Sequence, residues 1–248
     1  MLEKAGAKGD SQAYNEIGLI YQDDYSNLST GTILFDLDSR ITRENRDKAL
    51  EYFKKAAAMG NANAYTNMGE YYENGDFSQV VQVDYNKAVE YYKKAGELGD
   101  ALGYVSLAGM YQGKCEDETF KSCAGAFKKS VEYLTLAGAL GDDYSYKELG
   151  DTYFYGGLFY RDWEEYQKVP APPSYTPRIP RDYKKAAHCY HKCADMGEGY
   201  CYVSLANMYQ KGLGVKKDRK KARAYANHGD AILCDMGEED TCEGMGNS

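Results

Sequence analysis

One pattern occurs five times along this chain of 248 residues. Each copy has apolar residues at i, i+3 and i+7 and a small residue at i+4, a spacing that places all four on one face of an α-helix. Tyrosine holds the first and last positions, and the Gly or Ala lets another helix approach closely. The copies are Tyr14, Ile17, Gly18, Tyr21; Tyr65, Met68, Gly69, Tyr72; Tyr104, Leu107, Ala108, Tyr111; Tyr146, Leu149, Gly150, Tyr153; and Tyr202, Leu205, Ala206, Tyr209.

A second helix is predicted after each copy, marked by a Lys-Ala or Lys-Ser pair. In the first four copies a glycine follows this Ala or Ser eleven residues later, where the C-terminal cap of a helix is expected. In the fifth copy the distance from Ala222 to Gly237 is fifteen residues, which predicts a second helix about one turn longer. The pairs are Lys48-Ala49, Lys87-Ala88, Lys129-Ser130, Lys185-Ala186 and Lys221-Ala222, and the glycines of the first four are Gly60, Gly99, Gly141 and Gly197.

Helical repeats with a period near 40 residues predict a solenoid, in which each hairpin buries its apolar face against its neighbours. We therefore expect one array over residues 1–248, with repeats at about 11–60, 61–99, 100–141, 142–197 and 198–238. Residues 1–10 match the end of a second helix, and we interpret them as the tail of a truncated preceding repeat with Met1 as an added start. The absence of a signal peptide therefore says nothing about location.

The Tyr-x-x-Leu-Gly-x-x-Tyr helix, the Asp-Tyr-x-Lys-Ala-x-x-Tyr-Tyr-x-Lys-Ala helix at residues 84–95 and the closing Gly-Asp resemble the Sel1-like repeat family, a relative of the tetratricopeptide repeat. The resemblance covers nearly the whole chain. It implies an all-α fold, a right-handed α/α solenoid of about five Sel1-like hairpins. It also implies a non-catalytic scaffold or adaptor that binds a protein or peptide.

By analogy with tetratricopeptide arrays, the partner-binding groove is expected on the first helices. Counted from the Gly or Ala of each pattern, positions −3, +1 and +4 share a stripe that we interpret as not required by the core. Amides and carboxylates on this stripe suit the backbone of an extended peptide, and ordinary solvated surface is the alternative. The candidate groove residues are Asn15, Gln22, Thr66, Glu70, Glu73, Gln112, Lys147, Asp151, Asn207 and Gln210.

Six of the seven cysteines form three pairs with the spacing C-x7-C. Cys193 and Cys201 hold the positions of Ala56 and Ala64, on either side of the turn between two hairpins. Small residues at both positions imply a close approach that is compatible with a disulfide. The cysteine-rich Sel1-like proteins secreted by Helicobacter are similar in this respect, and bridges would favour a secreted or periplasmic protein. The candidate pairs are Cys193/Cys201, Cys234/Cys242 and Cys115/Cys123.

A dense cluster of potential metal ligands, from His188 to Cys193, does not have the geometry of a metal site. In the helical register His188 and His191 fall on the solvated face, whereas Cys189 points inward, so the ligands diverge and cannot form a tetrahedral site. We therefore predict no metal and no cofactor here. Cys189 is either a buried free thiol or an alternative partner for one of its neighbours.

Two insertions, at residues 23–44 and 155–181, separate the first from the second helix of their repeats. All five prolines lie in the second insertion, together with the only tryptophan. A stiffened, aromatic-rich loop is a candidate recognition element, and packing of the loop on its own hairpins is the alternative. The candidate recognition residues are Trp163, Tyr166 and Tyr175.

The net charge of −8 disfavours a nucleic-acid partner, and no apolar run approaches the twenty or so residues that a membrane span needs. One basic run, residues 211–223, carries seven Lys or Arg and a single Asp. We interpret this run as a solvated face rather than a binding patch.

Penicillin-binding or β-lactamase-like activity, as described for Helicobacter relatives, is the alternative function. A serine β-lactamase needs Ser-x-x-Lys and a Lys-Thr-Gly strand, and the sequence contains neither motif. No glycine-rich phosphate loop or G-x-S-x-G turn is present either. The sequence therefore predicts a binding module rather than an enzyme, with no catalytic residues assigned.

Overall fold

The computed structural model describes residues 1–28, 35–74, 83–113, 120–156 and 180–237, and the side chains of 1–22, 44–74, 83–112, 125–156 and 180–237. Over these residues the protein has eleven α-helices and no strand, which confirms the all-α prediction. The helices are α1 (Leu2–Gly6), α2 (Ser11–Leu28), α3 (Phe35–Ala58), α4 (Ala62–Asn74), α5 (Tyr85–Glu97), α6 (Ala101–Gly113), α7 (Phe120–Ala139), α8 (Asp143–Tyr155), α10 (Tyr183–Asp195), α11 (Gly199–Lys211) and α12 (Arg219–Asp235).

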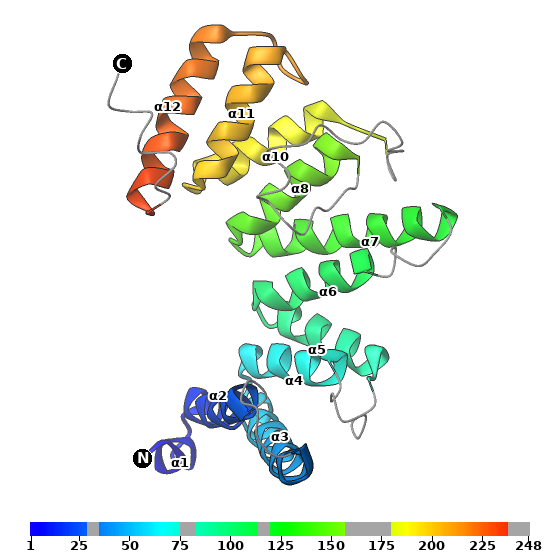
Figure 1. The fold of residues 1–248 in the computed structure, drawn as a ribbon, viewed down its shortest axis with the longest axis vertical. Coiled ribbons are helices and arrows are strands. Elements are labelled where there is room, and N and C mark those ends of the chain that lie inside the picture. Colours follow the sequence, from blue (N-terminus) through cyan, green and yellow to red (C-terminus); the bar gives the residue numbers. More distant parts are fainter. Residues whose placement is uncertain (29–34, 75–82, 114–119, 157–179, 238–248) are drawn as a thin grey trace. The chain divides into compact units, whose positions relative to one another are not determined.

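The helices form two compact units, Met1–Leu107 and Ala108–Ser248, whose boundary falls within α6 (Figure 1). In the first unit α1 packs on α2, α2 on α3, α3 on α4 and α4 on α5. In the second unit α7 packs on α8, α8 on α10, α10 on α11 and α11 on α12. Within each unit these helices therefore pack on helices next to them in the sequence, as in an α/α solenoid.

Each second helix ends at a glycine with positive φ, as the sequence predicts. The φ angles of Gly60 and Gly197 are 85° and 99°. After Gly60, the backbone N–H of Asn61 bonds to the carbonyl of Ala56 at 3.1 Å, which satisfies a carbonyl of the last helical turn. The fifth copy differs in length as expected, because α12 has 17 residues and α10 has 13. The turn after α1 has the same form, with φ of 105° at Gly9.

The aspartate of the Asp-Tyr-x-Lys motif is the N-terminal cap of the second helix. The Asp84 carboxylate accepts a hydrogen bond from the backbone N–H of Lys87 at 3.1 Å, and Asp182 accepts one from Lys185 at 3.0 Å. These bonds satisfy backbone donors that have no partner within the helix. The motif therefore fixes where the second helix begins.

The small residue of each first helix allows a ring from the second helix to reach its backbone. A methyl group added to Gly69 would overlap the ring of Tyr92, and one added to Gly150 would overlap the ring of Tyr190. Both tyrosines are only 1% exposed. Phe53 makes the same contact with Gly18. We call this place on the second helix the ring position.

Four of the five tyrosines that close the first-helix pattern take part in a repeated stack. The tyrosine that closes the first-helix pattern lies parallel to a second-helix tyrosine, and the lysine of the Lys-Ala pair lies over the first ring. Lys87, for example, lies 5.0 Å from the ring centroid of Tyr72, which stacks on Tyr91 at 5.4 Å. The equivalent stacks are Tyr21 on Tyr52, Tyr111 on Tyr133 and Tyr209 on Tyr225.

The first insertion is largely helical lengthening. Because α2 extends to Leu28 and α3 begins at Phe35, residues 23–28 and 35–44 belong to helices. Of the second insertion the structure describes only residues 155–156 and 180–181. Its recognition candidates Trp163, Tyr166 and Tyr175 lie outside the described residues.

Candidate interaction surfaces

Two residues of the predicted groove lie in the core of the first unit. Asn15 and Thr66 are 2% and 1% exposed, so the interpretation that the core does not require them is wrong. The Asn67 amide donates to Asn15 Oδ1 at 2.9 Å, and the Thr66 hydroxyl donates to Asp100 Oδ2 at 2.6 Å. At these two places position −3 faces the next hairpin, and its polar group joins one hairpin to the other.

The remaining candidates of the first unit form a hydrogen-bonded acidic network. The hydroxyl of Tyr92 donates to Glu73 Oε2 at 2.7 Å. Burial raises the pKa of Glu70 above its ordinary value, and the nearby charges of Glu73 and Asp100 add to this shift. Gln22 donates a hydrogen bond to the Glu70 carboxylate, which opposes the shift. These side chains are engaged in joining α2, α4 and α5.

In the second unit the candidates on α6 and α8 are held by intramolecular bonds at positions that remain partly open. The Gln112 amide donates to the hydroxyl of Ser130 at 2.7 Å. Lys147 Nζ lies 3.0 Å from Asp151 Oδ2, and their side chains are 15% and 14% exposed. The hydroxyl of Tyr190 donates to the other oxygen of Asp151 at 2.6 Å.

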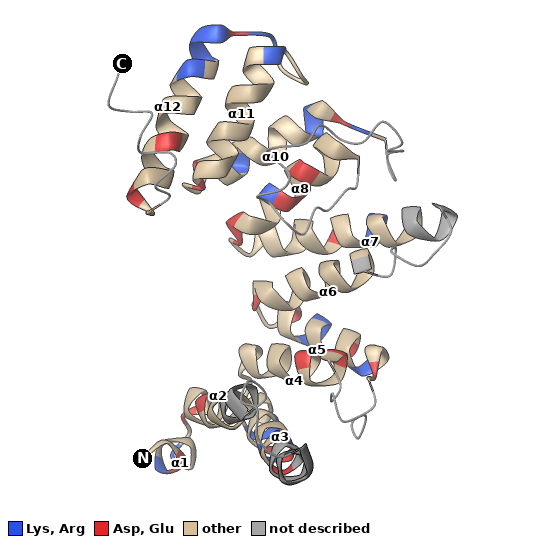
Figure 2. Ribbon diagram, in the orientation of Figure 1, with Lys and Arg blue, Asp and Glu red and all other residues tan. Residues whose placement is uncertain are grey.

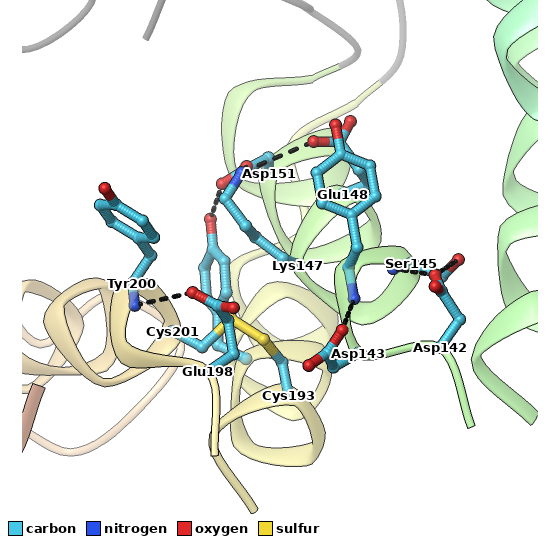
Figure 3. Close-up of a disulfide and its surroundings, with 12 residues drawn as sticks. Asp142, Asp143, Ser145, Lys147, Glu148, Asp151, Cys193, Glu198, Tyr200 and Cys201 are labelled. Carbon is cyan, nitrogen blue, oxygen red and sulfur yellow. Dashed lines mark hydrogen bonds and ion pairs between the residues drawn. A yellow bond between two sulfur atoms is a disulfide. The ribbon is translucent and has the colours of Figure 1, made fainter. Parts of the chain in front are cut away.

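Glu148 completes this charged cluster on α8 (Figure 3). Its carboxylate lies 3.5 Å from Lys147 Nζ. Burial raises the pKa of Glu148 above its ordinary value. Burial opposes the charge of Lys147, but Asp151 and Glu148 outweigh it and the pKa of the lysine is raised. The stripe did not include Glu148, because position −2 carries small or polar residues in other copies and gives no repeated signal.

Of the two candidates on α11, Gln210 lines an open cavity between α11 and α12. Asn207 is partly buried and Gln210 is exposed. The cavity has a volume of about 450 Å³ and lies beside the start of α12, where Lys and Arg gather (Figure 2). Its lining residues are Ala206, Gln210, Lys217, Arg219, Ala222, Arg223 and Ala226.

The disulfide between Cys193 and Cys201 is present, with a Cα–Cα distance of 5.9 Å (Figure 3). Both residues are fully buried and join α10 to α11 across the turn between two hairpins. Cys189 is a buried free thiol, and burial raises its pKa to about 11.

The other two predicted pairs fall partly or wholly outside the described residues. Cys234 is disulfide-bonded, and its predicted partner Cys242 lies outside the described part. Cys115 and the side chain of Cys123 also lie outside it.

Two of the three histidines of the second unit lie against tyrosine rings. His191 lies 3.3 Å from the hydroxyl of Tyr209 and edge-on to Tyr225, while the ring of His228 packs on Tyr202. Within the described residues no three His, Cys, Asp or Glu side chains gather as a metal-ligand set. None of the described helices combines the length and apolarity needed to cross a membrane.

Four stretches of the sequence, residues 30–61, 62–100, 176–198 and 199–227, match the Sel1 repeat. The chain belongs to the Sel1 repeat family. Sel1 repeats commonly serve as protein-interaction modules. The third hairpin, α6 and α7, lies outside the matched stretches, yet its Tyr111–Tyr133 stack repeats the geometry of the matched hairpins.

Solved Sel1 structures share this fold. A Sel1 repeat protein from Oxalobacter formigenes is 21% identical, with a TM-score of 0.57 over 91% of this chain and 75% of that one. A protective antigen of uropathogenic Escherichia coli with an SLR fold is 21% identical, with a TM-score of 0.55 over 96% of this chain. The chain described here covers only 44% of that antigen's length.

The cysteine-rich protein B of Helicobacter pylori is also similar, with 24% identity and a TM-score of 0.38 over 68% of this chain and 98% of that one. No curated protein matches the sequence significantly.

Proposed function

We propose that this Sel1-repeat protein is a non-catalytic scaffold that binds a protein or peptide along the first helices of its second unit. The observation that carries the proposal is the set of polar side chains on α6 and α8 that are fixed by internal bonds yet reach the surface. Gln112 is held by Ser130, and Asp151 is held by both Lys147 and Tyr190.

Fixed polar side chains favour binding because less conformational freedom is lost when a partner docks. Immobilising a long side chain at an interface costs roughly 0.5–1.5 kcal/mol, and side chains that are already held avoid much of this cost. The amide of Gln112 and the carboxylate of Asp151 keep hydrogen-bonding capacity beyond their internal bonds. Such groups suit the backbone of an extended peptide.

The proposal is tested by affinity capture from envelope and secreted fractions of the source organism, followed by affinity measurement with the purified partner. A variant carrying Gln112→Ala and Asn207→Ala is expected to bind about tenfold more weakly or worse, since losing two hydrogen bonds costs roughly 1–3 kcal/mol. Lys184→Ala, an exposed change on the second helix α10, is the control. Equal affinity of all three proteins would contradict the proposal. Turnover of a chromogenic cephalosporin by the purified protein would instead favour the β-lactamase-like alternative.

We also propose that the protein works in a secreted or periplasmic setting. The disulfide at Cys193 and Cys201 and the bonded state of Cys234 support this placement, because such bonds persist in oxidising compartments. Rapid alkylation of intact cells of the source organism, followed by mass spectrometry, tests it. Recovery of Cys193 and Cys201 as alkylated thiols would contradict the placement.

A further inference from the structure

The cavity beside α12 lies where the other hairpins carry a large side chain. Counted from the Lys-Ala pair, the ring position is held by Phe53, Tyr92, Leu134 and Tyr190, each between 1% and 2% exposed. In the fifth hairpin the same position is Ala226, which lines the cavity. The cavity therefore follows from the loss of a ring that the repeat normally places there.

The floor of the cavity is apolar and made of small side chains. Ala206, Ala222 and Ala226 contribute only methyl groups, and Ala206 is the small residue of the first-helix pattern. In three other hairpins a ring covers the equivalent small residue. A volume of about 450 Å³ lies within the usual range of ligand pockets, roughly 300–1,000 Å³. One apolar side chain from outside the protein could occupy the floor.

The rim of the cavity is cationic. Lys217, Arg219 and Arg223 are exposed and line it, and over the described residues none of the three forms an ion pair. Arg223 occupies the position at which Leu50 and Ala187 are buried, 9% and 4% exposed. A position that is apolar in the other four hairpins, and buried in two of them, is therefore charged and open here.

The one acidic residue of the basic run does not neutralise this rim. The Asp218 carboxylate accepts hydrogen bonds from the backbone N–H groups of Lys220 and Lys221, both at 3.0 Å, and so caps α12. Lys221 itself lies over the ring of Tyr209, 5.3 Å from its centroid. The rim thus keeps three cations and the exposed amide of Gln210 for an external partner.

We propose that the cavity binds an acidic peptide segment of a partner protein, with one apolar or aromatic side chain seated over the three alanines. Carboxylates on either side of that residue pair with Lys217, Arg219 and Arg223, and arginine can hold a carboxylate through two hydrogen bonds. This inference rests on the proposed scaffold function and assigns a partner chemistry to it. The net charge of −8 repels a nucleic acid, whereas a short acidic segment meets only the local cationic rim.

The probe is a fluorescein-labelled peptide with one phenylalanine between two pairs of Asp or Glu, and binding is measured by fluorescence anisotropy. We expect saturable binding that weakens as salt is raised, because the rim charges are solvent-exposed. Replacing the phenylalanine by alanine in the peptide is expected to weaken binding tenfold or more. The same loss is expected for Arg223→Ala in the protein.

The decisive variant is Ala226→Leu, which fills the cavity. It has a precedent in the chain, because Ala108 packs with Leu134 in the third hairpin, the same pair of positions as Ala206 and Ala226. We expect at least a tenfold loss of peptide affinity with unchanged far-ultraviolet circular dichroism. Lys220→Ala removes one charge from the same basic run but does not line the cavity, so it is the matched control and should bind normally.

Several outcomes would overturn the inference. These are an absence of peptide binding by the wild-type protein, undiminished binding by Ala226→Leu, and a loss of affinity in Lys220→Ala as large as that in Arg223→Ala. Competition by inorganic phosphate together with indifference to the peptide's phenylalanine would identify a simple anion site. If Ala226→Leu loses the peptide but still captures the envelope partner through Gln112 and Asn207, both proposals stand as separate surfaces. Failure of capture alone contradicts only the scaffold proposal.

Discussion

The ring of Tyr190 lies against the Cα of Gly150, so closely that a methyl group on this glycine would overlap it. The hydroxyl of the same tyrosine bonds to Asp151, the next residue on α8. One side chain therefore sets the spacing of α8 and α10 and also fixes a charged group on the proposed binding face. Packing and surface chemistry are coupled at this contact.

Gly150→Ala is expected to destabilise the protein by about 1–3 kcal/mol, the usual cost of overpacking a filled core. Urea denaturation measures the change in the free energy of unfolding. Gly109→Ala is the matched control, because Gly109 is exposed within α6 and an added methyl group meets no neighbour. That variant should be more stable by roughly 0.5–1 kcal/mol, the helix preference of alanine over glycine. Similar effects of the two changes would contradict the close contact.

The double variant Cys193→Ala and Cys201→Ala is expected to lose about 2.5 kcal/mol of unfolding free energy, the loop entropy of a bridge over this short separation. Packing should survive, because Ala56 and Ala64 fill the equivalent positions between the first and second hairpins and are fully buried. Chemical denaturation without reductant measures the loss. Wild-type protein treated with reductant should lose a similar amount of unfolding free energy. An unchanged unfolding free energy in the double variant would contradict the prediction.

Cys189 is expected to resist thiol reagents in the folded protein. Burial raises its pKa to about 11, so the reactive thiolate is scarce near neutral pH. Mass spectrometry after iodoacetamide treatment should find one modified cysteine only when denaturant is present. The intact mass should also show three disulfides, as the pairing of the other six cysteines predicts. Modification of all seven cysteines in native protein would contradict both expectations.

Glu70→Gln is expected to stabilise the protein at pH 7. Burial raises the pKa of Glu70 in the folded state, so folding favours the protonated carboxyl, and this contribution is lost as pH rises through the folded pKa. Glutamine keeps an acceptor for Gln22 without the charge. The difference in unfolding free energy between variant and wild type should shrink toward about pH 4, where wild-type Glu70 is mostly protonated. A gain that does not depend on pH would contradict this cause.

Filling the cavity beside α12 should also raise stability. Ala226→Leu is expected to add about 0.5–2 kcal/mol, as other cavity-filling substitutions do. A rise in thermal midpoint together with a loss of acidic-peptide binding would separate the two roles of this position. A destabilised variant would mean that the space between α11 and α12 cannot hold the larger side chain.

The periodic features of the sequence predict most of the fold. Positions such as Gly69 and Leu149 lie where the helical spacing places them, and the glycines after the second helices have the expected positive φ. The bridge at Cys193 and Cys201 could be predicted as well, because Ala56 and Ala64 mark the same close approach in another copy. Repetition turns a weak local signal into a reliable one.

The surface could not be predicted in the same way. Helical periodicity places Asn15 and Thr66 on a face, but it does not say how far the neighbouring first helix covers that face. Burial of both residues depends on side chains from other hairpins, Asn67 and Asp100, which lie far away in the sequence. The sequence does give a signal for the cavity, because Ala226 stands at the ring position where the other hairpins carry a large side chain. Only the structure shows that Arg223 and Gln210 line the same cavity.

The bridge between α10 and α11 changes how the last described hairpins can open. In a repeat array a hairpin is held only by its neighbours, so local unfolding can proceed one hairpin at a time. Cys193 and Cys201 join the end of one hairpin to the start of the next. Local unfolding of α11 and α12 is therefore coupled to unfolding of α10. The amide protons of these three helices should exchange with solvent as one cooperative unit.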